Sequence, residues 1–187
     1  LILGGLFKKM VIADNCALLA NQIFESYPTQ SGSTLFAGAV FFAFQIYGDI
    51  SGYSDIAIGS SRLLGFDLMK NFNFPYLSQN MSEFWKRWHI SLSSWFRDYV
   101  YIPLGGSRVS NARLVLNIMI VFLVSGLWHG ANLTFVFWGG IHALFVIPVI
   151  ILHKKCKTHT TSAPVAIWRQ LLNIGATFSM VVLAWVF

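Results

Sequence analysis

Residues 114–152 read LVLNIMIVFLVSGLWHGANLTFVFWGGIHALFVIPVIIL. Two apolar runs, 114–128 and 133–152, are separated by the short turn 130–132. A bilayer core about 30 Å thick needs about 20 apolar residues in a helix, so the stretch predicts two membrane-spanning helices joined by a tight turn. His129 directly follows the first run, at the edge of the span, where an ionisable side chain is costly and usually marks a functional site.

The composition extends this reading to the whole chain. Hydrophobic residues make up 56% of it, charged residues only 11%, and the mean hydropathy is +0.62. A soluble domain is about a quarter charged. We therefore predict an all-α integral membrane protein, a polytopic helical bundle. Further spans are expected near 10–24, 35–58 and 171–187, and residues 1–187 are read as a single fragment of a larger fold.

The net charge of +6 is unevenly distributed. Lys and Arg gather in the connections 60–113 and 154–170, while 25–34 and 130–132 contain none. This asymmetry predicts that both basic connections are cytoplasmic, and it places His129 toward the external half of the membrane. Anionic membrane lipids, not nucleic acid, are the expected partners of the basic residues.

The long basic connection contains a predicted amphipathic helix near 81–102. Residues 84–102 read FWKRWHISLSSWFRDYVYI, in which apolar residues recur at helical spacing. Asn80, with Glu83 three residues later, predicts the N-terminal cap. An aromatic face opposite a basic face is typical of a helix in the membrane interface. His89 falls on the aromatic face of this predicted helix.

Two histidines are candidate catalytic residues on these grounds. Neutral imidazole accepts a proton near physiological pH, so His129 could act as a general base. It could equally hydrogen-bond to a neighbouring helix. His89 could position a substrate, or it could be a buried histidine that anchors the amphipathic helix.

Other polar residues give weaker signals. Asp49 and Asp55 could belong to an ion or proton pathway, or to a polar cluster where a span reaches the cytoplasm. His142 and His129 could face each other across the hairpin, but no third ligand has matching spacing, so no metal site is predicted. A serine-nucleophile motif is also missing from the sequence.

Two longer strings resemble a known family. WHISLSSWFRDYVYIPLGGSR at 88–108, followed by SGLWHGANLTFVFWGGIHA at 125–143, is similar to the membrane-bound O-acyltransferase (MBOAT) superfamily. Within it, the chain resembles the branch of bacterial alginate O-acetyltransferase membrane subunits. The resemblance implies that His129, in the Trp-His-Gly motif, is catalytic, and that His89, in the Trp-His-Ile-Ser-Leu-Ser motif, is a second catalytic position.

The resemblance also implies a function. Acetyl groups would move from a cytoplasmic thioester donor, acetyl-CoA or an acylated carrier, toward hydroxyls of an exported polysaccharide such as alginate. No bound cofactor is expected. The protein would be a multi-pass protein of the bacterial inner membrane, with periplasmic or extracellular acetyltransferase partner proteins.

Three alternatives stay open. Teichoic-acid D-alanyl transfer proteins share the WH-SLS-W-RDY pattern of residues 88–99. A non-catalytic transporter could use His129, Asp49 and Asp55 as a proton relay. A scaffold subunit could recruit soluble acetyltransferases without catalysing transfer itself.

Overall fold

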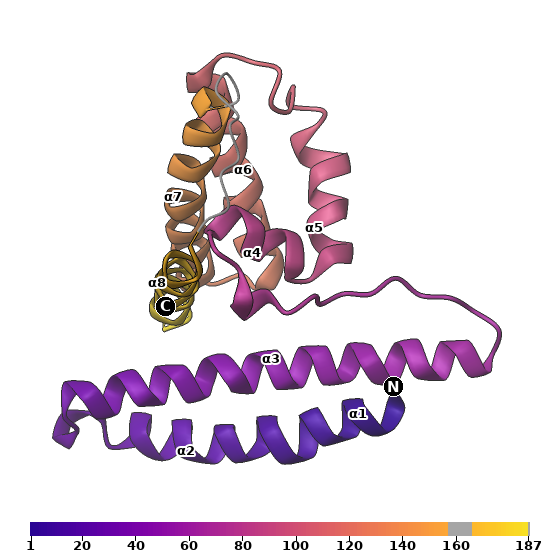
Figure 1. The fold of residues 1–187 in the computed structure, drawn as a ribbon, viewed down its shortest axis with the longest axis vertical. Helices are drawn as coiled ribbons and strands as arrows, with labels where there is room; N and C mark the ends of the chain where they lie inside the picture. The colour runs from indigo at the N-terminus through magenta and orange to yellow at the C-terminus, as the bar shows by residue number, and fades with distance from the viewer. Residues whose placement is uncertain (157–165, 187) are drawn as a thin grey trace. The chain divides into compact units, whose positions relative to one another are not determined.

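The computed structural model describes residues 1–156 and 166–186, and over these ranges the chain is helical with no strand (Figure 1). The predicted basic connection 154–170 thus lies largely outside the described residues. Four of the described helices are long and apolar enough to cross a membrane: α3 (Gly32–Leu63), α6 (Asn111–His129), α7 (Leu133–Cys156) and α8 (Ile167–Ala184). The prediction of an all-α membrane fold is confirmed.

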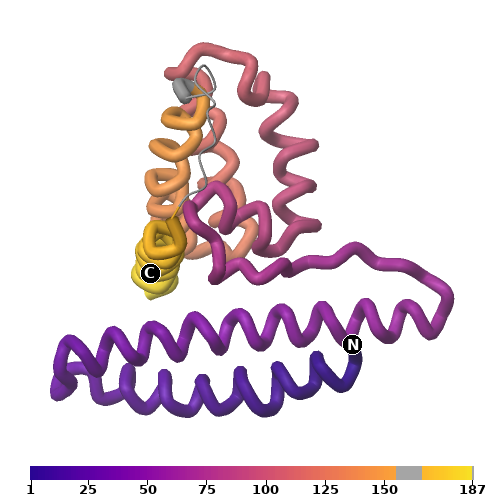
Figure 2. Tube along the Cα trace, viewed as in Figure 1, coloured from indigo at the N-terminus to yellow at the C-terminus, as the bar shows by residue number. Residues whose placement is uncertain are grey.

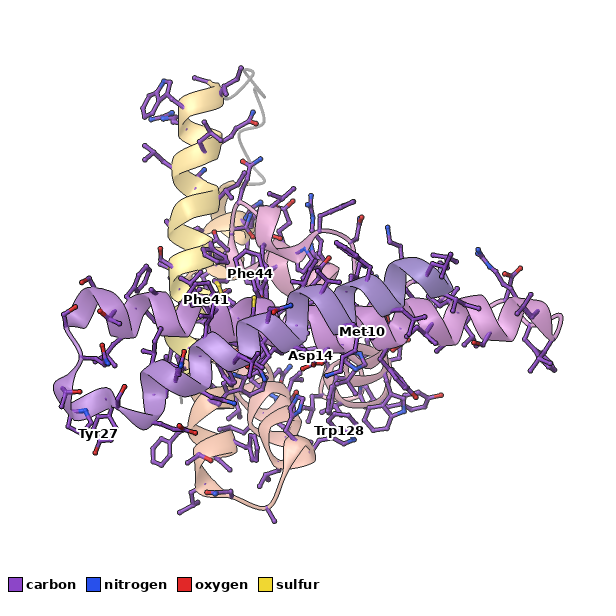
Figure 3. All side chains as sticks on the ribbon, turned by 90° about the horizontal axis from the view of Figure 1, so that it is seen from below. Met10, Asp14, Tyr27, Phe41, Phe44 and Trp128 are labelled. Atoms are coloured by element: carbon purple, nitrogen blue, oxygen red, sulfur yellow. The ribbon has the colours of Figure 1, made fainter. Side chains whose placement is uncertain are left out.

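The chain forms two compact units, the first of which covers residues 1–71. Its trace runs out along one helical arm and returns along α3 (Figure 2). Tyr27 lies at the turn between the arms (Figure 3). The first arm comprises α1 (Ile2–Phe7), a π-helical stretch η1 (Lys8–Ala13) and α2 (Asp14–Glu25).

Glycines let the two arms of the first unit approach closely. A Cβ atom at Gly52 would lie 2.8 Å from the carbonyl oxygen of Gly5, and one at Gly48 would lie 3.1 Å from that of Lys8. Small residues at such contacts allow membrane helices to pack backbone against backbone. The arms are therefore held by close packing along α3.

The second unit, residues 72–185, is built on the hairpin that the sequence predicts. α6 and α7 lie side by side (Figure 1), and two glycines set their separation. Gly126 faces the carbonyl oxygen of Phe135, and Gly139 faces that of Phe122, each too closely to admit a Cβ atom. Asn132 begins the second helix, because its Oδ1 accepts a hydrogen bond from the Thr134 N–H at 3.1 Å.

The amphipathic segment begins as predicted. Asn80 Oδ1 accepts a hydrogen bond from the Glu83 N–H at 2.8 Å, and Glu83 Oε2 accepts one from the Gln79 N–H at 2.8 Å. This reciprocal arrangement satisfies N–H groups that have no partner within the helix. The segment then folds as α4 (Met81–Arg87), α5 (Ile90–Phe96) and a π-helical stretch η4 (Arg97–Tyr101).

The structure differs from one continuous helix at residues 88–89. His89 has a left-handed backbone with φ of 44°, a conformation that is uncommon outside glycine. The carbonyl of Arg87 accepts a hydrogen bond from the Asn73 N–H at 3.0 Å, and that of Trp88 accepts one from the Ser93 hydroxyl at 3.2 Å. These bonds replace the helical ones, so a single helical wheel does not describe how His89 is placed.

Packing of α6 against α7 predicts that substitutions at two adjacent glycines change stability to different extents. Gly139→Ala should destabilise the full-length protein by about 1–3 kcal/mol, because overpacking forces the helices apart. Gly140→Ala is the matched control, since its Cβ would meet only the Leu123 side chain at 3.9 Å. Thermal unfolding of both variants in detergent measures the difference, and equal stabilities would contradict this account of the hairpin.

Candidate functional site

His129 is the last residue of α6 and is exposed. Its ring makes an edge contact with Trp138, with ring centroids 5.1 Å apart, and a looser stacked contact with Phe135 at 6.4 Å. In the described part of the chain no side chain or carbonyl hydrogen-bonds to its nitrogens. The imidazole is thus oriented by aromatic packing and keeps its nitrogens available to another molecule.

His89 is the N-cap residue immediately before α5 and is half-buried. Its Nδ1 lies 3.5 Å from the Ser91 hydroxyl, and its ring lies 6.1 Å from that of Phe72. Burial disfavours the charged form and lowers the pKa of His89 from its ordinary value of 6.5. This histidine is therefore neutral at physiological pH.

Four tryptophans link the elements of the second unit. Trp85 and Trp88 come from α4 and its end, Trp138 comes from α7, and Trp185 follows α8. Their ring centroids are 5.8 Å apart for Trp85 and Trp138, 5.1 Å for Trp88 and Trp185, and 5.7 Å for Trp138 and Trp185. We call these four residues the tryptophan cluster.

The tryptophan cluster connects the two predicted site residues. His129 contacts Trp138, and His89 reaches Trp88 through Phe72, which lies 5.0 Å from Trp88. The structure thus brings both residues to one aromatic core.

A third histidine lies at this core, and the sequence suggested it only as a weak metal ligand. His142 lies four residues after Trp138 on α7 and is fully buried. Its ring lies 4.7 Å from that of Trp138 and 4.9 Å from that of Trp85. The spacing to Trp138 could have placed His142 on the same helical face as that ring, but the partners from α4 and α8 are not evident in the sequence.

A hollow of about 750 Å³ lies beside α4 and the far end of α7. Lys86, His153 and Lys154 line it, together with hydroxyl and amide groups and an apolar wall. Its carboxylate, Glu83, is paired with Arg87. The hollow therefore has an excess of positive charge and of hydrogen-bond donors, which suits an anionic ligand with an apolar portion.

Three aspartates of the first unit form ion pairs with lysines. Lys8 Nζ lies 2.6 Å from a carboxylate oxygen of Asp55, and Lys9 Nζ lies 2.7 Å from both Asp49 and Asp14. These pairs favour the polar-cluster interpretation of Asp49 and Asp55. Among residues 1–156 and 166–186, no group of three or more histidine, cysteine or acidic side chains could hold a metal.

Comparison with protein families gives the same assignment as the motifs. The model of the membrane-bound O-acyltransferase family matches residues 16–186. The chain belongs to this family. Its membership confirms the resemblance seen in residues 88–108 and 125–143, and both candidate histidines lie inside the matched region.

Three relatives show the range of the family around this chain. The probable alginate O-acetylase AlgI of Pseudomonas aeruginosa is 43% identical over 97% of the chain, and the peptidoglycan O-acetyltransferase of Helicobacter pylori is 41% identical over 98%. The teichoic acid D-alanyltransferase of Bacillus subtilis is 33% identical over 75% of the chain. The matches cover 33%, 34% and 37% of these relatives, so the chain spans about a third of their length.

The buried state of His89 predicts a pH dependence of stability. The unfolded chain binds a proton at this residue more readily than the folded one, so stability should fall as the pH drops from 6.5 toward the lowered pKa of His89. His89→Asn removes the titrating group and suits the left-handed backbone. Chemical unfolding of the full-length wild type and variant between pH 5 and 8 measures this, and parallel profiles would contradict the assignment.

Proposed function

We propose that the protein transfers an acyl group, most simply acetyl, from a thioester donor to a hydroxyl, with His129 as the general base. The observation that supports this best is an imidazole without a hydrogen-bond partner in the described chain, fixed against Trp138 at the end of a span. The family to which the chain belongs is named for O-acyl transfer. Aromatic contacts hold such a base in place without consuming its nitrogens.

The reaction needs no nucleophile from the protein. His129 removes the proton of the acceptor hydroxyl, and the oxygen attacks the thioester carbonyl carbon. The carbon–sulphur bond then breaks, and the leaving thiolate takes the proton from the imidazolium. One base thus serves both steps, since an imidazole can accept a proton and then return it.

The donor is proposed to be acetyl-CoA or an acylated carrier, without a bound cofactor. Both present phosphate esters on an otherwise long and partly apolar arm. The positively charged hollow beside α4 offers Lys86 and Lys154 to such phosphates and an apolar wall of Leu114, Val149 and Ile150 to the arm. Because the charge asymmetry predicts that the basic connections are cytoplasmic, the donor would approach from that side.

His89 is proposed to position the donor and is the second catalytic candidate. A neutral imidazole on a rigid helical break can accept or donate one hydrogen bond without introducing a charge. Its closeness to the tryptophan cluster supports a role along the route between donor and acceptor.

The acceptor is proposed to be a hydroxyl of an exported polysaccharide. Relatives named for alginate and for peptidoglycan acetylation have nearly equal identity to this chain. The proposal therefore names the class of acceptor, an exported glycan, and not one polymer. D-alanyl transfer to teichoic acid is less favoured, because that relative has lower identity over less of the chain.

We also propose a cellular location for the protein. A multi-pass location in the bacterial inner membrane would place donor and acceptor on opposite sides. Periplasmic or extracellular acetyltransferases could complete delivery to the polymer, and membrane lipids would surround the apolar helices. The ion pairs of Asp49 and Asp55 make the alternative proton-relay transporter less attractive.

Replacing the proposed base tests the function directly. His129→Gln and His129→Ala in the full-length protein should lower acyl transfer by about 10²–10⁴-fold, the usual contribution of a general base. Leu127→Ala, an exposed position on the same turn, is the matched control. Product acetylation and donor thioester hydrolysis are both measured, and donor hydrolysis that persists without His129 would overturn the assignment. A scaffold subunit would show no hydrolysis in the wild type either.

Charge in the hollow tests the donor route. Lys86→Glu should raise the KM for the thioester donor about tenfold with kcat little changed, since it removes binding that is equal in the ground and transition states. Arg113→Ala, an exposed cation outside the hollow, is the control. Steady-state kinetics at fixed ionic strength measure the effect, and an unchanged KM would argue against donor binding there.

A further inference from the structure

The centre of the second unit contains polar ring atoms that have no hydrogen-bond partner among the described residues. His142 is 0% exposed, and neither Nδ1 nor Nε2 makes a hydrogen bond to any described residue. The buried indole N–H groups of Trp85 and Trp185 are likewise unpartnered within residues 1–156 and 166–186. These three side chains come from α4, α7 and the end of α8.

The three rings meet at one place. The centroid of His142 lies 4.9 Å from that of Trp85 with the planes at 88°, and 6.1 Å from that of Trp185 with the planes at 67°. Both rings that carry an unpartnered indole N–H therefore pack against the ring of His142.

The chemistry of this group is one-sided. An indole only donates, and a neutral imidazole has one donor and one acceptor nitrogen. The site thus offers three N–H donors and a single acceptor. Leaving a buried polar group without a hydrogen bond costs about 1–3 kcal/mol, so such a site favours a molecule that brings a hydrogen-bond acceptor into it. A carbonyl oxygen is an uncharged acceptor that suits an apolar core.

The position of the group relates it to the proposed base. The rings of His129 and His142 both contact Trp138, at 5.1 Å and 4.7 Å. Their centroids consequently lie within about 10 Å of each other, which is the span of a base, an attacking hydroxyl and an acyl carbonyl in near-attack geometry.

We propose that His142, Trp85 and Trp185 donate hydrogen bonds to the carbonyl oxygen of the acyl group. They would thereby stabilise the negative charge that develops on that oxygen. This inference rests on the proposed acyl transfer. As the hydroxyl oxygen attacks, the carbonyl π electrons move to oxygen, and the N–H donors hold that oxyanion until the carbon–sulphur bond breaks. Preorganised donors in a site that excludes water are especially effective in this role.

Three substitutions separate this role from packing. His142→Phe keeps a ring but removes both nitrogens, while His142→Gln retains an N–H donor. Trp85→Phe removes one indole donor. Val146→Ala, buried one turn further along α7, removes packing only and is the control. We expect His142→Phe to lower kcat about 10²–10³-fold, as loss of one oxyanion donor does, with a nearly unchanged donor KM and partial rescue by His142→Gln.

A binding measurement tests the site without turnover. The probe is S-(2-oxopropyl) phosphopantetheine with a ¹³C-labelled ketone, which is the arm that CoA and acylated carriers share. Hydrogen bonding should shift its carbonyl stretch to lower frequency in the full-length wild type, less so in Trp85→Phe and least in His142→Phe. Val146→Ala should keep the wild-type shift.

The outcomes distinguish this inference from the proposed function. The shift should persist in His129→Gln, because that variant loses only the base. The absence of a shifted band in the wild type would overturn the proposed carbonyl-binding site. An equal shift in the wild type and in His142→Phe would also overturn it, and is the result expected if only ordered water partners His142. Acyl transfer that survives loss of His129 would instead overturn the proposed function, whatever the carbonyl band shows.

Discussion

Close contact between the backbones of α6 and α7 is the constraint on which the site depends. Gly126 and Gly139 bring each helix against a carbonyl oxygen of the other. In lipid there is little hydrophobic force between helices, so van der Waals contact of this kind is a main source of their association. The register it imposes puts Trp138 of α7 beside His129 at the end of α6. A wider hairpin would leave the histidine without its aromatic support.

The break between α4 and α5 also helps to build the aromatic core around the site. A continuous helix would carry the aromatic residues of 84–96 along one stripe. The left-handed His89 instead ends α4 after Trp85 and Trp88, which both remain in the tryptophan cluster, and α5 begins in a new direction. Such a conformation persists only where surrounding bonds over-determine it, and the hydrogen bonds to the carbonyls of Arg87 and Trp88 supply them.

Sequence reasoning found the elements that depend on local patterns. Apolar length identified the spans 35–58, 114–128 and 133–152, and the Asn80 cap was evident from residue spacing alone. The break at His89 was missed because its cause includes an N–H from Asn73, a contact that no periodicity encodes. His129 and His89 were recognisable as unusual polar residues, but what surrounds them is tertiary. Trp185, in a span that looked merely apolar, contributes an indole to the core.

His142 shows why polarity inside an apolar core must be judged by its partners. Considered alone it was a weak metal ligand, and its position in a long span suggested nothing more. In the fold, His142 packs against two indole rings whose N–H groups are also unpaired among the described residues. Stability alone does not favour this arrangement. Apolar side chains of similar size would fill the space without the cost of burying unpaired polar groups. Departures of this kind concentrate at functional sites. An acyl carbonyl accounts for the departure because it supplies the acceptor that the rings lack, and only when the acyl group is in place.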